Sequence, residues 1–393
     1  MVSVIFWDVQ GNRIEDTLPD EEQVDILHSV TEILPDAPVI LGELRKVAQT
    51  DISKLHQLGQ NHFFVFDATM TDGAHYIVRV ARFSEPTELS YLRDKVQREC
   101  EILKWMGSLD SLPVPKPILC DATSPSPPFM ITNKCEGIQV IYGFGTLSED
   151  AKMRNLRSFA RFAIAMFQAK CPQQIGSIMR FSSNSESPRD SGSTKVEIGP
   201  VVAYRKTETP SQCFSSAQEY IRWLIACKQN RANSVANVKP ILRRAEAIFA
   251  QETQRQDEEQ LRCIPWHGDA VSHNILIDNS GEITGVIDWE FHMILPAYLA
   301  VDYPSWITYD GLQDPNFFPT TGQFSPFWPT SRQEATSLRQ MYDEHLEIVK
   351  KLDHTYYLSL KKGEIARLIM QWLIADEDRE LFVRTTTYED TSD

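Results

Sequence analysis

Residues 263–290 read CIPWHGDAVSHNILIDNSGEITGVIDWE, and the fold of the rest of the chain is inferred from this stretch. It opens with a His-Gly-Asp triplet at residues 267–269. Asn274 follows Asp269 at a spacing of five residues. We therefore expect a polar loop that carries an acid and a carboxamide close together in the chain.

Two short apolar runs follow this loop, at residues 275–277 and 286–287, and the turn residues Asn279-Ser280-Gly281 separate them. Asp288 stands directly after the second run. The order predicts a loop, a strand, a tight turn and a second strand. A two-stranded ribbon of this length would bring Asp288 and the loop to the same edge.

Two acids and a carboxamide suit phosphoryl transfer, which needs a carboxylate to take the acceptor's proton and hard oxygen ligands for Mg²⁺. The kinase catalytic loop separates its base from its metal-binding Asn by the same five positions, and a second Asp follows after a hairpin. Asp269 is therefore the candidate base, and Asn274 and Asp288 are the candidate metal ligands. Two landmarks differ from protein kinases: Gly268 replaces an Arg, and Asp288 begins Asp-Trp-Glu instead of Asp-Phe-Gly.

The segment HGDAVSHNILID…GVIDWE resembles the aminoglycoside phosphotransferase and choline kinase-like enzymes, most closely their large fungal branch. The resemblance implies an α+β, protein-kinase-like, two-lobed fold, with a small antiparallel N-lobe sheet and a mostly helical C-lobe. It implies an N-lobe with hinge over 58–137 and a C-lobe over 138–393, and the amphipathic patterns of residues 1–57 predict a helical extension packed on the N-lobe. The implied reaction moves the γ-phosphate of ATP or GTP to a hydroxyl of a small molecule with the help of Mg²⁺. His267 is expected to hydrogen-bond within the catalytic loop and shape it.

The N-lobe carries the nucleotide-binding candidates. Residues 63–66 and 75–80 read as strands around a turn at residues 71–73, and the segment before them holds Gly59 and Asn61, which the resemblance places near the nucleotide phosphates. Arg79 occupies the position of the kinase strand Lys, and the fungal branch resembles this chain in having Arg there. The apolar spacing of residues 89–106 predicts a helix, on which Glu99 matches the glutamate that pairs with the strand cation.

The short apolar strand of residues 128–132 leads into the segment that resembles the interlobe hinge, where backbone groups hold the adenine. Asn133 and Cys135 are the candidates there by resemblance.

The remaining chain reads mainly as helices. We expect them at residues 21–34, within 41–58, and at 148–170, 214–228, 238–254, 333–351 and 362–374. The polar, Ser-rich residues 180–195 predict a mobile loop inside an inserted hairpin. Five residues near or beyond the second Asp could face a substrate, and packing or a place on the solvated surface is an equally good reading of each: Trp289, Glu290, Asp302, Trp306 and Asp310.

Composition limits the classes of function. With 393 residues, 42% hydrophobic and 24% charged, the chain is long enough for two globular lobes. A net charge of −15 argues against a nucleic-acid partner. No apolar run reaches the ~20 residues that span a bilayer, and the first residues lack the pattern of a signal or transit peptide. Seven scattered cysteines predict reduced thiols in a cytoplasmic protein. The oligomeric state cannot be read from the sequence.

Three other readings stay open at this point. The first is a kinase-like protein that binds nucleotide without catalysis, because Arg79 departs from the usual Lys. In the second, His267, Asp269, His273 and Asp288 are ligands of a metal hydrolase. In the third, the two acids merely cap a turn and a strand end. Protein kinase activity lacks support because no Ala-Pro-Glu segment follows Asp288.

Overall fold

The computed structural model describes residues 4–7, 13–16, 37–60, 63–83, 88–109, 112–123, 127–182, 195–231, 238–309, 312, 329 and 331–375. The chain forms two compact units. Unit 1 comprises residues 1–138 and 284–290, and unit 2 comprises residues 139–283 and 291–393. The three-part division predicted from the sequence stays a prediction.

A five-stranded antiparallel sheet forms the centre of unit 1, in the order β3-β4-β5-β7-β6. Its strands are β3 (Ile52–Gln60), β4 (Phe63–Met70), β5 (His75–Ala81), β6 (Pro117–Asp121) and β7 (Phe129–Asn133). The turn between β4 and β5 contains Gly73 at φ +88°, a left-handed conformation that favours glycine. The predicted strands at 63–66, 75–80 and 128–132 are thereby confirmed.

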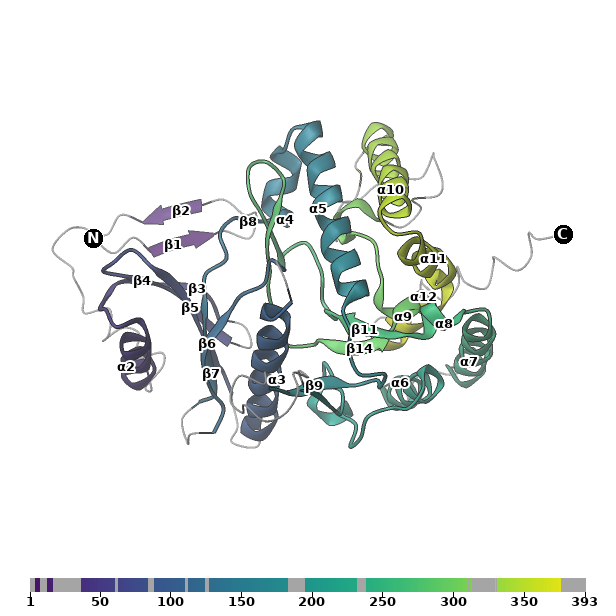
Figure 1. Ribbon diagram of the computed structural model, residues 1–393, viewed down its shortest axis with the longest axis horizontal. Helices are drawn as coiled ribbons and strands as arrows, with labels where there is room; N and C mark the ends of the chain where they lie inside the picture. Colours follow the sequence, from purple (N-terminus) through teal and green to yellow (C-terminus); the bar gives the residue numbers. More distant parts are fainter. Residues whose placement is uncertain are drawn as a thin grey trace, which may run out of the picture. The chain divides into compact units, whose positions relative to one another are not determined.

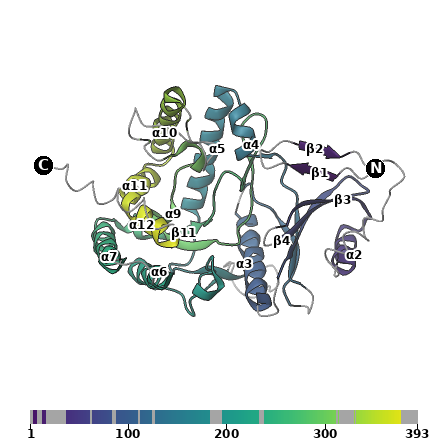
Figure 2. The ribbon, with the colours of Figure 1, turned by 180° about the vertical axis from the view of Figure 1, so that it is seen from behind.

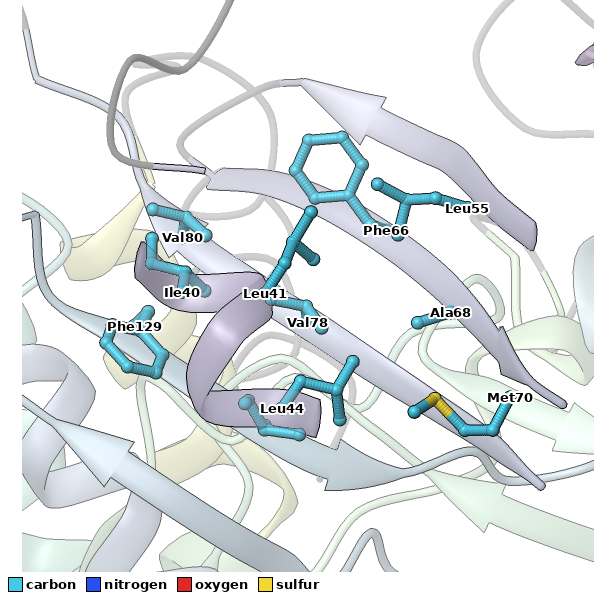
Figure 3. Packing of buried hydrophobic residues seen from close by; sticks show 11 residues of the cluster. Ile40, Leu41, Leu44, Leu55, Phe66, Ala68, Met70, Val78, Val80 and Phe129 are labelled. Carbon is cyan, nitrogen blue, oxygen red and sulfur yellow. The ribbon is translucent and has the colours of Figure 1, made fainter. Parts of the chain in front are cut away.

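Two helices cover opposite faces of this sheet, α2 (Ala37–Ala48) and α3 (Leu89–Gly107) (Figures 1 and 2). On β5, Val78 and Val80 pack in one cluster with Leu41 of α2 (Figure 3), whereas Arg79 between them reaches α3. This follows from the period of two in a strand. Each fully buried Val or Leu contributes about 1.5–3 kcal/mol. The core against α2 thus fixes the direction in which Arg79 points.

The first part of the chain departs from expectation. The helix predicted within residues 41–58 ends at Ala48, because strand β3 begins at Ile52. A second pair of strands, β1 (Val4–Trp7) and β2 (Arg13–Asp16), stands where only helices were expected. Pairing with β4 overrides the weak helical pattern of residues 52–58. The helix expected at residues 21–34 lies outside the described residues.

Unit 2 is mainly helical, and its long helix α5 (Glu149–Gln168) begins as predicted. The Ser148 side chain caps it by accepting a hydrogen bond from the Ala151 N–H, and Glu149 and Asp150 follow in its first turn. Its apolar side packs in a core cluster that includes Ala160, Ile164 and Phe167. The other helices are α4 (Val140–Gly143), α6 (Ala217–Arg231), α7 (Val238–Gln254), α8 (Glu258–Leu261), α9 (Ala297–Ala300), α10 (Arg332–Leu352), α11 (His354–Lys362) and α12 (Glu364–Ile374).

Short strands accompany these helices: β9 (Ser177–Ser182) pairs with β10 (Lys195–Gly199), and β11 (Cys263–Trp266) pairs with β14 (Met293–Pro296). Strands β8 (Ile138–Gln139), β12 (Ile275–Ile277) and β13 (Ile283–Val286) complete the described set. The inserted hairpin is confirmed, but residues 180–182 belong to β9 instead of a loop. Residues 183–194 lie outside the described part of the chain.

The helix expected at residues 362–374 starts two residues later, and Gly363 separates it from α11. A Cβ on Gly363 would collide with the carbonyl oxygen of Tyr298. Arg367 donates hydrogen bonds from its guanidinium to the same Tyr298 carbonyl and to that of Ser359. Close approach of the backbone thus ends the first helix. Among the described residues, no helix combines the length and apolar character needed to cross a membrane.

His345 gives unit 2 a pH-dependent stability. Its ring is fully buried on α10 beside Phe159, at 6.0 Å between ring centroids, and burial lowers its pKa from 6.5 to about 4. Between pH 6.5 and pH 4 His345 is protonated in the unfolded chain and neutral in the folded chain. The free energy of unfolding therefore falls as the pH drops through this range. From pH 7.5 to pH 5 this residue should cost about 2 kcal/mol. Urea unfolding of the wild type and of His345→Leu at both pH values measures the difference. Equal pH dependence in both proteins would contradict the expectation.

Candidate active site

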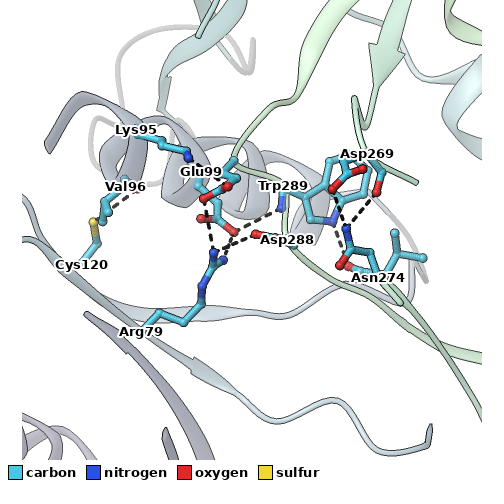
Figure 4. A network of polar contacts seen from close by, with 11 residues as sticks. Arg79, Lys95, Val96, Glu99, Cys120, Asp269, Asn274, Asp288 and Trp289 are labelled. Carbon is cyan, nitrogen blue, oxygen red and sulfur yellow. Dashed lines mark hydrogen bonds and ion pairs between the residues drawn. The ribbon is translucent and has the colours of Figure 1, made fainter. Parts of the chain in front are cut away.

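Arg79 on β5 is the centre of the polar cluster in unit 1. Its guanidinium donates to Glu99 Oε1 on α3 and, at 2.7 Å, to Asp288 Oδ1 (Figure 4). The Arg79 guanidinium also lies 3.5 Å from Glu290 Oε2, a second carboxylate of residues 284–290. The guanidinium also lies 4.6 Å from the ring centre of Phe63. One cation therefore meets the helix glutamate and the second Asp, which lie 20 and 209 positions away in the sequence.

The backbone at Asp288, two residues after the end of β13, is strained, with φ +68°. Outside glycine, mainly Asn and Asp tolerate this left-handed conformation, and such strain is common at functional sites. Trp289 holds the turn, because its ring N–H donates to the Val286 carbonyl at 2.8 Å and its backbone N–H donates to Glu99 at 3.2 Å. Asp288 thus projects its carboxylate from a fixed turn and keeps about a third of its side-chain area exposed.

A second ion pair lies beside the first. Lys95, one turn before Glu99 on α3, lies 2.9 Å from Glu290, and both side chains are more than nine-tenths buried. The Lys95 ammonium also lies 5.8 Å from the ring centre of Phe63. Phe63 therefore borders both cations of the cluster. The sequence analysis missed Lys95, although a spacing of four residues from Glu99 on a predicted helix was a usable signal.

The unit 1 cluster contains three carboxylates and two cations, and most of it is buried. Burial by itself lowers the pKa of Arg79, but Glu99, Asp288 and Glu290 together raise it above the ordinary arginine value. Burial raises the pKa of Glu99 and of Glu290, with Arg79 opposing both shifts. The cluster therefore carries one more carboxylate than its own cations balance.

The catalytic-loop residues of unit 2 form a second, compact set. The Asn274 amide donates to the carboxylate of Asp269 at 3.1 Å and to the Asp269 carbonyl at 2.9 Å (Figure 4). The Asp269 N–H donates to Nδ1 of His267 at 3.2 Å, a hydrogen bond within the loop of the kind expected for this His. The loop then turns through Val271, whose N–H donates to the Asp269 carbonyl. Asp269 and Asn274 thus lie together.

Gly268 explains why this loop lacks the Arg of protein kinases. Its φ is +85°, and a Cβ on it would collide with the carbonyl oxygen of Phe291. The Tyr204 hydroxyl donates to the Gly268 carbonyl, and the Tyr204 ring stacks on Phe291 at 4.1 Å between centroids. Sequence reasoning did not find Tyr204, because nothing in its local pattern marks a tyrosine that reaches residue 268.

We expect Gly268→Ala to destabilise the protein by at least about 2 kcal/mol, because the new Cβ adds both backbone strain and a collision. Gly145→Ala is the matched control, since a Cβ there meets no atom within 4 Å and φ is not left-handed. Urea unfolding of both variants measures the effect. If both variants show the same small change in the urea concentration at half-unfolding, the loop adapts to the extra methyl group.

The nucleotide candidates from the sequence are scattered through unit 1. Gly59 lies in β3, beside an irregularity in its pairing with β4, and Asn61 lies outside the described residues. Asn133 ends β7, and its side-chain oxygen accepts a hydrogen bond from the Lys116 N–H at 2.5 Å. Burial raises the pKa of the Cys135 thiol to about 11. Their contact with a nucleotide stays a prediction.

The residues considered for substrate contact are mostly structural. Trp289 and Trp306 are completely buried, and the Trp306 ring N–H donates to Asn155 of α5 at 3.0 Å. Asp302 accepts from Gln371 at 2.9 Å, and Glu290 pairs with Lys95. These contacts favour packing roles, which the sequence analysis had left open. Asp310 lies outside the described residues.

The donor set suits a hard divalent cation. One oxygen each of Glu99, Asp288 and Glu290 lies within 4.8 Å of the other two, and the excess negative charge favours a cation. All three carboxylates contact Arg79 or Lys95, and Asp288 is the one that keeps about a third of its side-chain area exposed, so it is the carboxylate that a metal could reach. In unit 2, the Asn274 side chain donates from its amide nitrogen to Asp269, so its carbonyl oxygen is the atom that could hold a metal. Such oxygens are the ligands that Mg²⁺ prefers.

An antiparallel sheet carrying a cation paired to a helix glutamate, joined to a helical unit with a His-Gly-Asp loop, defines a kinase-like phosphotransferase fold. Residues 58–299 match the model of the phosphotransferase enzyme family, APH, and the chain belongs to this family.

The chain is also similar to one curated protein and to several solved structures. The chain is 29% identical over 348 residues to the Clavilactone A biosynthesis cluster protein Y of Ampulloclitocybe clavipes, covering 85% of this chain and 82% of that protein. Among solved structures, the streptomycin–ATP complex of APH(2")-IIa is similar at a TM-score of 0.49 and 12% identity, over 91% of this chain and 96% of that one. A ternary complex of APH(4)-Ia with ADP and hygromycin B is similar at 0.47 and 17%, over 89% and 99%. At TM-scores below 0.5, these two likenesses add nothing to the family assignment.

Proposed function

We propose that the protein transfers the γ-phosphate of ATP or GTP to a hydroxyl group of a small molecule. The observation that carries the proposal is the double contact of Arg79 with Glu99 and Asp288. It unites in unit 1 the strand cation, the helix glutamate and the second Asp that phosphoryl transfer uses. The pairing of Asp269 with Asn274 in unit 2 supports it.

In this proposal each unit supplies its own groups. In unit 1, Arg79, held by Glu99, would contact the nucleotide phosphates and Asp288 would be a ligand of Mg²⁺; in unit 2, Asn274 would be a ligand of Mg²⁺. When bound, the metal neutralises charge on the phosphates and orients them. Asp269 accepts the proton of the acceptor hydroxyl, and His267 keeps the loop in shape through its hydrogen bond to the Asp269 N–H. Positioning and charge stabilisation supply most of the acceleration.

The acceptor is proposed to carry an apolar or aromatic part. Around the catalytic loop, the stacked Tyr204 and Phe291 and the neighbouring Trp266 and Trp223 form an aromatic wall of unit 2. Arg205 and Arg231 on the same wall outnumber Glu208, the one acid that lines it, so the wall offers no excess of acids for a polycationic aminoglycoside. The relative from a biosynthesis cluster fits an acceptor from small-molecule biosynthesis.

A transfer assay with [γ-³²P]ATP and Mg²⁺ tests this function against a panel of phenols, aromatic alcohols, amino alcohols, sugars and aminoglycosides. We expect labelled product with an aromatic or apolar alcohol, at a kcat/KM at least tenfold above that for any aminoglycoside. Transfer restricted to aminoglycosides would refute the acceptor class and leave the phosphotransferase activity intact. No transfer to any member, together with tight nucleotide binding, would favour the alternative below.

The alternative is a kinase-like protein that binds nucleotide without catalysis. The observation in its favour is that three carboxylates surround Arg79, which replaces the usual Lys with a different donor geometry. A thermal-shift titration with Mg·ATP separates a nucleotide-binding protein from one that binds none. The transfer assay then separates the enzyme from the scaffold.

A further inference from the structure

A single tyrosine of unit 2 connects the aromatic wall with the catalytic loop. The Tyr204 ring stacks on Phe291, with 4.1 Å between the centroids and 28° between the ring planes. The Tyr204 hydroxyl donates a hydrogen bond to the Gly268 carbonyl. Gly268 directly precedes Asp269, the candidate base. One side chain therefore contacts both the wall proposed for the acceptor and the backbone beside the base.

The hydrogen bond from Tyr204 differs in kind from those inside the loop. Within the loop, the Asp269 N–H donates to His267 at 3.2 Å, and the Val271 N–H donates to the Asp269 carbonyl at 2.8 Å. These contacts join residues that are two positions apart, so they shape the loop locally. Tyr204 lies 64 positions before Gly268, so its hydroxyl ties the loop to a distant segment. The position of the loop carbonyl thus depends on how firmly Tyr204 is held.

A buried hydroxyl fixes the backbone beside both rings of the stack. Ser177, at the start of β9, is fully buried; its Oγ donates to the His292 carbonyl at 2.9 Å and accepts from the Val202 N–H at 3.1 Å. Val202 lies two residues before Tyr204, and His292 directly follows Phe291. Breaking either contact would leave a buried polar group without its partner, which is costly. The stacked pair is therefore held in place before any acceptor binds.

The inserted hairpin of β9 and β10 supplies this anchor. Gly176, directly before β9, exchanges two backbone hydrogen bonds with Ile294 of β14, at 2.7 Å and 3.4 Å. A Cβ on Gly176 would lie 2.2 Å from the carbonyl oxygen of Gly199, the last residue of β10. The base of the hairpin is thus closely packed, and the chain that leaves it runs directly into residues 201–205, which line the wall.

A second tyrosine on the same wall provides a contrast. Tyr220 of α6 is fully buried, and its hydroxyl lies 3.7 Å from the Met293 sulfur, as in an ordinary packing residue. Tyr204 keeps 42% of its area exposed although its hydroxyl is hydrogen-bonded. Its ring is therefore within reach of a ligand while its hydroxyl holds the loop.

We propose that Tyr204 both selects the acceptor and positions the catalytic loop: its ring packs against the acceptor, and its hydroxyl holds the Gly268 carbonyl so that Asp269 meets the acceptor hydroxyl. This assignment rests on the proposed function, in which Asp269 is the base. The Tyr204 hydroxyl keeps its proton, which it shares with the Gly268 carbonyl. An acceptor that packs on the ring restrains the hydroxyl, so acceptor binding and loop position are coupled.

Two substitutions in the full chain separate the ring from the hydroxyl. Tyr204→Phe keeps the stack and loses one hydrogen bond, so kcat should fall about tenfold while KM for the acceptor found in the panel stays within about twofold. Tyr204→Leu loses the ring as well, so its acceptor KM should rise by at least about tenfold. The affinity for Mg·ATP should stay within about twofold of the wild type in both variants. Steady-state kinetics and nucleotide titration measure these quantities.

Hydrogen exchange of the peptide covering residues 267–277 tests the positioning role without nucleotide or acceptor. In Tyr204→Phe the loop amides, among them those of Asp269 and Val271, should exchange at least about threefold faster than in the wild type. Tyr357→Phe is the matched control, because the hydroxyl of Tyr357 on α11 makes no hydrogen bond with any residue that the structure describes. It should change neither the exchange nor the kinetics.

Unchanged loop exchange in Tyr204→Phe would overturn the positioning role. An unchanged acceptor KM in Tyr204→Leu would overturn the selecting role of the ring. If kcat and KM change alike in both variants, Tyr204 is a packing residue and the coupling is wrong. If the panel contains no acceptor that becomes phosphorylated, the proposed function fails, whereas the exchange measurement still decides whether Tyr204 holds the loop.

Discussion

Asp269→Asn is expected to lower kcat by about 10²–10⁴-fold, because the variant keeps the shape of the side chain and loses the carboxylate that accepts the acceptor's proton. The amide of Asn274 and the hydrogen bond from the Asp269 N–H to His267 tie this side chain into a preformed loop. The variant should therefore transfer phosphate more slowly and keep an affinity for Mg·ATP within about threefold of the wild type. This split is expected for a group that acts in the transition state. Single-turnover phosphate transfer and nucleotide titration measure the two quantities separately.

Asp343→Asn is the matched control for this variant, since it makes the same substitution at an exposed position on α10. Its kcat should equal that of the wild type. If Asp269→Asn retains near-normal turnover with the acceptor that the panel identifies, Asp269 is not the base. If it loses nucleotide binding instead, the side chain acts in binding or folding and the assigned role is wrong.

Asp288→Asn is expected to weaken Mg²⁺-dependent nucleotide binding by at least about 100-fold, since even the outer partners of metal ligands contribute 10–100-fold. Asn tolerates the left-handed backbone at φ +68°, so the turn after β13 should persist. Arg79 keeps its partner Glu99 in this variant. Calorimetric titration with ATP, with and without Mg²⁺, measures the loss.

Asp288→Ala separates the charge from the backbone strain. Ala removes the same carboxylate but fits the left-handed conformation less well than Asn, so its unfolding temperature should fall below that of Asp288→Asn. Both variants should lose metal-dependent binding to a similar extent. Full Mg²⁺-dependent affinity in either one would remove Asp288 from the proposed metal site.

Much of the candidate site could be predicted because its groups are encoded locally. Asp269 and Asn274 are five residues apart in one loop, so their proximity follows from a short stretch of sequence and a turn. The strand and helix that carry Arg79 and Glu99 follow from periods of two and 3.6, and the resemblance supplied their pairing. The start of α5 at a Ser cap is another local signal.

The parts that could not be predicted depend on residues far apart in the chain. The pairing of Lys95 with Glu290 requires α3 and the segment after β13 to pack together. The extent of the sheet was also misjudged, since Ile52 and its neighbours join β3 only through pairing with β4. A single strand's own pattern is weak where its partner strand determines its conformation.

The sequence by itself determined which chemical groups this protein has and the order in which they occur: a His-Gly-Asp loop, an Asn five positions on, and an Asp after two short apolar runs. Only the tertiary structure decided how those groups are held. It placed Asp288 in a left-handed turn against Arg79, and it left Gly268 no room for a side chain beside Phe291. The physical reason is that residue types and local periods are properties of short segments, whereas strain, close approach and burial of charge arise only when distant segments pack.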